Sequence, residues 1–549
     1  MRLYPGDIEL LGTVARMPFL DRLELASLSG RSRAAVYQRI ERFLEAGLVE
    51  SVGQGSELVT PTRRFCLTGQ GVRRLASEEG LPVAQLLRTR PVSEQWRRLL
   101  LERLDAAAVI YRLAEQAAQF AFPLGLRWLR AAPMDALLEL PGHLRAAVVR
   151  QGRTADRTGF AKRIRRLKQT PGHGAVLVIC PDETRLRHAR RLVAGPPAIT
   201  FLALERDIAL AGAEAAVWRG PTGAAQLTLR EALGYALPAS GARPERPLVR
   251  VSMPEPLDPG CTDASWMLPA ALTTAEKRAL DLVGDWPWLR PGHLAALLGV
   301  GRRRLTQLLG RLDELGLITR LARAGAPRLA LSDRGLAYLA RRDRTSVGIA
   351  RKRWSPDPRG PGDSFDWRNV SGIRSRQLLR NLEHTESVHR FNSLLARQAR
   401  EQGARLVQLD PPHRASRYFR SFERLRSIQP DAYALLDTPE GERGFFLEWE
   451  RRAVRPATMA ARLAPYLRYY ATGRPLDDHG LLPRVLVVFE GELAADHFLR
   501  IAAAAVARAE VPLPLLVSDR QRLEQHGALG RAWRSVGRSI EHRAPHGLD

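Results

Sequence analysis

The chain has 549 residues, 45% of them hydrophobic, and a formal net charge of +27 at pH 7. Its length predicts about three to five domains, and the excess of positive charge favours a polyanionic partner, nucleic acid first. Acidic residues occupy the N-terminal segment where a signal peptide has its apolar core, and the alanine-rich run 106–122 is interrupted by Arg and Glu. The composition therefore argues against a secreted or membrane protein.

Two further features of the composition limit this interpretation. Most of the positive charge is arginine among abundant Ala, Leu and Gly, as a GC-rich genome also produces, so charge alone supports nucleic-acid binding weakly. Cys66, Cys180 and Cys261 are widely spaced and form neither a CxxC pair nor a zinc-site pattern. We therefore expect a reducing cytoplasm, where a nucleic-acid-binding protein would associate with the nucleoid.

Residues 18–49 repeat without a gap at residues 287–318. Each copy predicts a helix, a glycine-containing turn, a second helix and a strand, followed by a hairpin signal and a closing helix. The identities include Leu25/Leu294, Gly30/Gly299, Arg33/Arg302, Gln38/Gln307, Arg42/Arg311 and Gly47/Gly316. Both copies resemble winged helix-turn-helix domains, here expected at residues 1–80 and 269–345.

The winged-helix resemblance implies that the second helix of each copy enters the major groove of DNA and that the wing touches the backbone. In the first copy the expected contacts are Arg31, Ser32, Arg33, Tyr37 and Gln38, with Arg63 and Arg64 near the wing. In the second copy they are Arg302, Arg303, Arg304, Thr306 and Gln307. The alternative is a protein–protein module with a solvated basic face.

An α/β segment follows each of these copies, at residues 95–236 and 376–549. Both predict strand, strand, basic amphipathic helix, strand and helix in the same order, so we infer a tandem duplication. A proline-rich linker, 237–268, separates the halves. Residues 346–375 form a basic loop whose aromatic side chains either stack on nucleic acid or fold onto their own domain; they include Trp354, Phe365 and Trp367, beside Lys352.

The second α/β segment carries a constellation of acids. Asp431 follows Pro430, and Glu448 and Glu450 lie two residues apart in "FFLEWE", on one face of a strand. This layout resembles the PD-(D/E)XK nucleases, a resemblance that implies Asp431 and Glu448 as ligands of Mg²⁺. Glu450 stands at the lysine position, and neither Arg451 nor Arg462 can act as a general base, so hydrolysis by the usual mechanism is in doubt.

The helix "LEHTESVHRFN" adds Glu386 as the acid that completes such sites in that superfamily, with His384 and His389 beside it. The first half serves as an internal control. The overlay places Arg150 opposite Glu448, Gly152 opposite Glu450, Asp135 opposite Asp431, Ala108 opposite Glu386 and Ala106 opposite His384. The fold thus does not demand these acids, which favours a functional site in the second half.

Residues 270–500 resemble the replication-relaxation family of plasmids and other mobile elements, through "EHTESVHRFN", "QPDAYALL", "FFLEWERR", "YLRYY" and "LPRVLVVFE". We therefore expect an α+β and α/β multidomain protein with two winged helices, each followed by a nuclease-like mixed sheet. The leading hypothesis is a double-stranded DNA-binding protein acting in replication, relaxation or transfer, beside other replication or transfer proteins. The alternatives are a metal-dependent endonuclease or nickase and a transcriptional regulator, and the oligomeric state is open.

Overall fold

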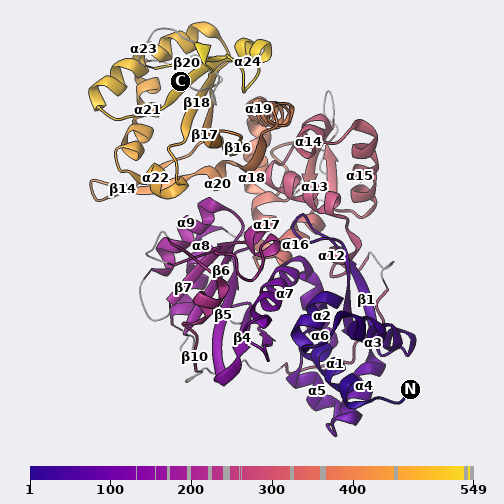
Figure 1. The fold of residues 1–549 in the computed structure, drawn as a ribbon. Helices are drawn as coiled ribbons and strands as arrows, with labels where there is room; N and C mark the ends of the chain where they lie inside the picture. Colours follow the sequence, from indigo (N-terminus) through magenta and orange to yellow (C-terminus); the bar gives the residue numbers. More distant parts are fainter. Residues whose placement is uncertain are drawn as a thin grey trace. The chain divides into compact units, whose positions relative to one another are not determined.

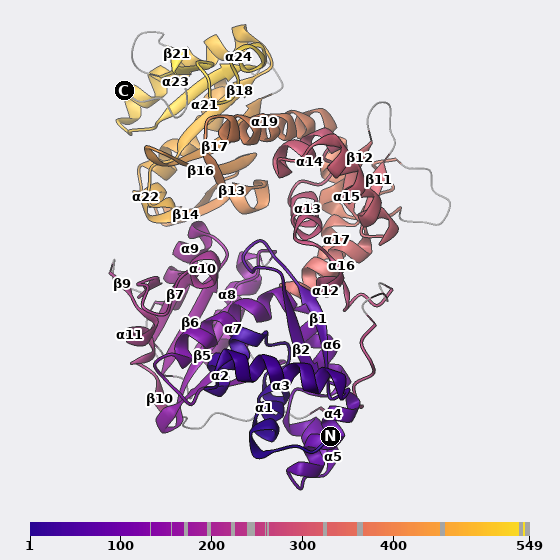
Figure 2. The same ribbon diagram turned by 45° about the vertical axis from the view of Figure 1, so that its right-hand side comes forward.

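The computed structural model describes residues 1–131, 133–154, 156–169, 174–194, 199–220, 225–238, 248–258, 260, 263–321, 327–358, 366–450, 456–536 and 542–543. Cys261, Phe365, Arg451 and residues 239–247 of the linker lie outside these ranges. The chain forms a mixed α and β fold with two compact units, Met1–Lys277 with Ala337–Ala350, and Arg278–Leu336 with Arg351–Asp549 (Figures 1 and 2). Over the described ranges, no helix has both the length and the apolar character needed to cross a membrane.

The chain twice forms three helices, a two-stranded antiparallel hairpin and a fourth helix. The first set is α1 (Pro5–Arg16), α2 (Arg22–Ser29), α3 (Arg33–Glu45), β1 (Val49–Gln54), β2 (Thr62–Leu67) and α4 (Gly69–Glu78). The second set is α13 (Thr274–Asp285), α14 (Pro291–Leu298), α15 (Arg302–Glu314), β11 (Ile318–Leu321), β12 (Arg328–Leu331) and α16 (Asp333–Arg342). Both orders agree with the helix and hairpin signals of the repeat.

The two sets also match at the residues that set their turns. Gly30 and Gly299 end α2 and α14 with left-handed φ values of 63° and 71°, a conformation that favours glycine. Thr68 and Ser332 precede the fourth helices, and each hydroxyl donates a 2.6 Å hydrogen bond to the carbonyl of the glycine before its hairpin. The internal repeat therefore extends from sequence to backbone geometry.

The first unit continues through α5 (Val83–Thr89), α6 (Glu94–Glu102) and α7 (Leu104–Ala118) into a mixed sheet. Its strands are β3 (Gly125–Trp128), β4 (Ala136–Leu140), β5 (Leu144–Arg150), β6 (Ala175–Cys180), β7 (Ile199–Leu204), β8 (Trp218–Arg219), β9 (Gln226–Leu227) and β10 (Leu237–Pro238). The other helical elements are the 3₁₀ turn Pro141–His143, α8 (Arg157–Lys168), α9 (Glu183–Val193), α10 (Glu205–Leu210), α11 (Leu229–Leu233) and α12 (Leu268–Ala271). β5, β6 and β7 are parallel, because α8 and α9 supply the crossovers.

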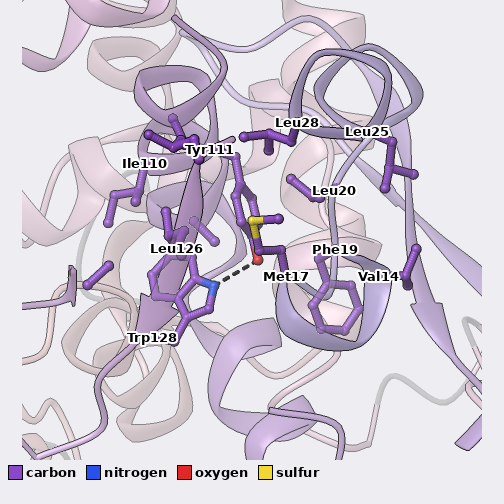
Figure 3. Packing of buried hydrophobic residues seen from close by; sticks show 14 of the residues in the cluster. Val14, Met17, Phe19, Leu20, Leu25, Leu28, Ile110, Tyr111, Leu126 and Trp128 are labelled. Atoms are coloured by element: carbon purple, nitrogen blue, oxygen red, sulfur yellow. Dashed lines mark hydrogen bonds between the residues drawn. The ribbon is translucent and has the colours of Figure 1, made fainter. Parts of the chain in front are cut away.

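One core joins α7 to the first helix set and to the sheet. Figure 3 shows Tyr111 of α7 beside Trp128 of β3 and near Met17 and Leu28 of the helix set. The Trp128 indole N–H donates to the Tyr111 hydroxyl at 2.8 Å, and that hydroxyl donates to the Pro18 carbonyl at 2.6 Å. Because both polar atoms are satisfied, these large side chains bury without an unpaired donor. The opposite face of the sheet packs against α8 and α9.

The second unit repeats this order from α19 onward. Its main sheet runs β13 (Arg405–Asp410), β16 (Ala432–Thr438), β17 (Gly441–Glu450), β18 (Arg484–Phe489), β19 (Leu515–Asp519), β20 (Trp533–Ser535) and β21 (His542–Arg543). α17 (Val347–Trp354) spans the boundary between the two units. The helices of the second unit that follow it are α18 (Ile373–Arg380), α19 (Leu382–Glu401), α20 (Pro412–Ala415), α21 (Pro456–Tyr470), α22 (Arg474–His479), α23 (Glu492–Ala509) and α24 (Arg520–His526). A separate hairpin, β14 (Arg417–Ser421) and β15 (Arg424–Ile428), is inserted between β13 and β16.

Candidate functional site

A basic surface lies on the first turn of α15. Arg302, Arg303 and Arg304 are exposed, as are Thr306 and Gln307. Gly301 precedes the helix without a capping side chain, and the first turn contains no acid. Within the described ranges none of the three arginines forms an ion pair. Uncompensated cations at the positive end of a helix dipole are unfavourable, whereas a bound phosphate would be stabilised there by backbone N–H groups and arginines together.

The corresponding face of α3 is less basic. Arg33, Tyr37 and Gln38 are exposed, and the Ser32 hydroxyl caps the helix by accepting the N–H of Ala35 at 3.3 Å. Arg31 forms an ion pair with Glu9. All five side chains predicted as groove contacts thus occur at or near one helix start, but only Arg33 offers an exposed arginine.

The prediction that Arg64 contacts DNA at the wing is wrong. The Arg64 side chain is fully buried, where its guanidinium meets Glu24 at 2.8 Å and the Phe19 carbonyl at 2.8 Å. Successive residues of a strand face opposite sides, so neighbouring Arg63 is exposed, and its guanidinium donates to the Ser51 hydroxyl at 2.9 Å. Arg63 alone of this pair is placed to meet a ligand.

Three of the four predicted acids of the second unit, Asp431, Glu448 and Glu450, lie where β16 begins and β17 ends. One Asp431 carboxylate oxygen accepts the Trp449 N–H at 2.8 Å, and the other lies 2.9 Å from His384 Nε2 of α19. Glu448 accepts a 2.6 Å hydrogen bond from the Tyr466 hydroxyl of α21. Burial, and then the charge of Asp431, raise the pKa of Glu448 to about 8. Both effects favour the protonated form of Glu448.

Glu450 lies on the same side of β17 and is buried. It forms an ion pair with Arg462 of α21, so the acid at the lysine position has its own cation. A cavity of about 300 Å³ opens beside these groups and is lined by Glu448, Glu450, Arg462 and Tyr466 together with mainly apolar side chains of α21, β18 and β19. Sequence reasoning assigned no role to Tyr466; its spacing of four from Arg462 puts both on one helix face.

Glu386 is engaged elsewhere. Its carboxylate forms ion pairs with Arg290 and Arg328, which hold its pKa below the usual range against the effect of burial. The side chain of α19 that reaches Asp431 is His384 instead; burial lowers its pKa, but the Asp431 carboxylate outweighs this and raises it. His389 is buried, with its ring centroid 5.9 Å from that of Trp286. Burial lowers the pKa of His389, which suits a neutral core residue.

The overlay of the two halves places Asp135 opposite Asp431 correctly but is wrong by one residue along β5 and β17. The Asp135 N–H bonds to the Val148 carbonyl, as the Asp431 N–H bonds to the Leu447 carbonyl. Val149 therefore stands opposite Glu448, and Gln151 opposite Glu450. Because side chains alternate along a strand, a slip of one residue exchanges the two faces. The inference that the first half lacks these acids survives the correction.

The first half fills the equivalent position with a closed ion network. Asp135 accepts the Arg150 N–H at 2.6 Å and pairs with Arg163 at 2.5 Å and Arg344 at 2.7 Å. Burial alone would raise the pKa of Asp135, but these guanidinium groups hold it below its usual range. Val149 replaces the glutamate within an apolar cluster. At this end of the first sheet the aspartate is thus fully engaged by guanidinium groups, and the position of Glu448 is apolar.

The residues of the second unit do not fit a preformed Mg²⁺ site. Both Asp431 oxygens already accept hydrogen bonds, the Tyr466 hydroxyl donates to Glu448, and Glu450 is paired with Arg462. Mg²⁺ demands an octahedral set of oxygen ligands, and each of these carboxylates would have to exchange its present partner for the cation. No group of three or more potential ligand side chains of the kind that holds a metal occurs among the described residues.

The chain was also compared with known proteins. No family model, curated protein or solved structure matches it.

Proposed function

We propose that this chain is a double-stranded DNA-binding protein that contacts the duplex through two winged helix-turn-helix domains, with α3 and α15 as the recognition helices. The observation that carries the proposal is the exposed cluster Arg302–Arg304 at the start of α15, whose members form no ion pair with any residue that the structure describes. The order of three helices, hairpin and helix, present twice, is the layout of the winged domains that dock in the major groove.

The two contacts are not equivalent. α15 begins with three exposed arginines, whereas α3 begins with Ser32 and one exposed arginine. A target of two different half-sites, or a direct repeat, therefore suits the chain better than a palindrome. Covalent linkage makes the second contact intramolecular, which raises its effective concentration. The resemblance to the replication-relaxation family supports a role in replication, relaxation or transfer of a plasmid or other mobile element.

Binding of blunt duplex DNA tests the proposal directly. We expect the full chain to bind a fluorescein-labelled duplex and its affinity to fall steeply as salt rises, because each neutralised phosphate releases counterions. Fluorescence anisotropy at several salt concentrations measures both quantities. Failure to bind duplex DNA at low salt would sink the proposal.

The endonuclease alternative has a specific geometry in its favour, since Asp431 and Glu448 do meet beside a cavity. Their existing partners argue against it, because Mg²⁺ would have to displace Tyr466 or His384. We therefore expect supercoiled plasmid incubated with protein and MgCl₂ to stay intact by gel electrophoresis. Nicking by the wild type that is absent from the Asp431→Ala variant would establish the enzyme instead.

A further inference from the structure

A β-hairpin of the second unit exposes an unusual set of side chains. β14 and β15 pair only with each other among the described strands, and Figure 1 shows them protruding from the body of this unit beside α22. Phe422 at the tip is 93% exposed, Leu425 is 70% exposed and Tyr418 is 51% exposed. Large apolar side chains clustered on one protruding element mark an interaction site.

The base of this hairpin is firmly anchored. Phe419 and Ile428 are buried in the core beneath the sheet. Arg417 is 2% exposed, and its guanidinium donates to the carbonyls of Arg414 and Ala415 at 2.6 and 2.7 Å. The hairpin is thus a fixed projection whose outer part alone is free to meet a partner.

The turn holds a bulky aromatic residue where the backbone favours a small one. Phe422 and Glu423 have φ values of 48° and 61°. Two-residue turns of this hand prefer Asn-Gly or Asp-Gly, because a Cβ is disfavoured at positive φ. An aromatic ring held at the tip despite this preference is a feature expected of a functional contact.

The charge of the hairpin selects the class of partner. Arg420, Arg424 and Arg426 are exposed, and within the described part of the chain none of them forms an ion pair. Glu423 is the acid among these exposed hairpin residues. Arginine beside exposed aromatic rings is the surface that binds single-stranded nucleic acid, with phosphates on the cations and bases on the rings.

The hairpin leads directly to the candidate site. Ser427 and Ile428 of β15, with Gln429, line the cavity beside Glu448 and Glu450, and Asp431 follows two residues later. The first half joins β3 to β4 through residues 129–135, which are too few for a second hairpin of this size. The insertion therefore occurs in the half that carries the acids.

We propose that the β14–β15 hairpin binds an unpaired DNA strand, with a base stacked on Phe422 and phosphates held by Arg420, Arg424 and Arg426. This inference rests on the proposed DNA-binding function and adds a substrate structure to it, duplex DNA with a melted or single-stranded segment. A base in an intact duplex is already stacked on its neighbours, so an isolated aromatic tip suits an unpaired base.

The test compares binding of labelled oligothymidine and of a blunt duplex by fluorescence anisotropy, using the full chain. Removing one stacking ring costs about tenfold in affinity. We expect Phe422→Ala to weaken oligothymidine binding by about that factor, Phe422→Trp to retain it, and both variants to bind the blunt duplex within about twofold of wild type. The Arg424→Ala/Arg426→Ala variant should weaken oligothymidine binding more than Arg500→Ala/Arg508→Ala, a control that removes the same charge from α23.

The outcomes distinguish the proposed hairpin contact from the proposed binding of duplex DNA. Loss of oligothymidine binding in Phe422→Ala with duplex binding intact supports the hairpin contact. Unchanged oligothymidine binding in Phe422→Ala overturns the hairpin contact, while duplex binding by the wild type leaves the proposed function standing. Wild-type binding to phosphatidylserine vesicles that Phe422→Ala abolishes, with oligothymidine binding unchanged, would assign the hairpin to a membrane surface instead.

Discussion

Replacing Arg302, Arg303 and Arg304 together by alanine is expected to weaken binding to duplex DNA by roughly 1,000-fold or more. A hydrogen bond to a charged group contributes about 1.5–3 kcal/mol, and tenfold in affinity corresponds to about 1.4 kcal/mol. The slope of log affinity against log salt should also become shallower by about 2.7, since each lost phosphate contact removes about 0.9. Anisotropy titrations over a range of salt concentrations measure both changes.

The triple alanine variant should be at least as stable as the wild type. Alanine has the highest helix propensity, and removing positive charge from a helix N-terminus relieves an unfavourable interaction with the dipole. We expect its melting temperature to equal or exceed that of the wild type. The matched control is alanine at Arg397, Arg500 and Arg508, which are exposed on α19 and α23. Equal losses in the two triple variants would show that net charge, not α15, governs binding.

The helices of the repeat could be predicted because their signals are local. Apolar residues at helical spacing and glycines at the turns define α2, α3 and their later copies, and the structure places Gly30 and Gly299 in the left-handed conformation that only such a turn needs. The proximity of Asp431 and Glu448 could also be predicted, because antiparallel strands joined by a short turn bring these positions together.

The direction of a side chain and its partners from other elements could not be predicted from local sequence patterns. Whether the Arg64 side chain points inward depends on which face of the β1–β2 hairpin packs on the core. Its partner Glu24 lies in a different element, the helix α2. Glu386 forms ion pairs with Arg290, at the start of α14, and with Arg328 of β12. The β14–β15 hairpin was not predicted at all, because its Phe-Glu turn lacks the usual glycine or asparagine. The failures at Arg64 and Glu386 concern partners that lie far apart in the chain.

Glu448→Gln is expected to make the protein more stable at pH 8 and to leave it nearly unchanged at pH 5. The folded-state pKa of Glu448, about 8, lies above its ordinary value of 4.5. Between these values the folded state binds more protons than the unfolded state, so wild-type stability falls as pH rises from about 4.5 to 8. The glutamine in this variant cannot titrate, and its side-chain carbonyl can still accept the Tyr466 hydroxyl.

The gain at pH 8 should be on the order of 2–4 kcal/mol, because one pKa unit corresponds to about 1.4 kcal/mol and Glu448 is only partly shielded from water. Urea unfolding at pH 5, 6.5 and 8 measures it. Glu442→Gln, an exposed position on the same strand, is the control and should follow the wild type at every pH. Parallel stability curves for Glu448→Gln and wild type would show that Glu448 is ionised in the folded protein. An ionised Glu448 beside Asp431 would in turn restore the pair of negative ligands that the endonuclease alternative requires.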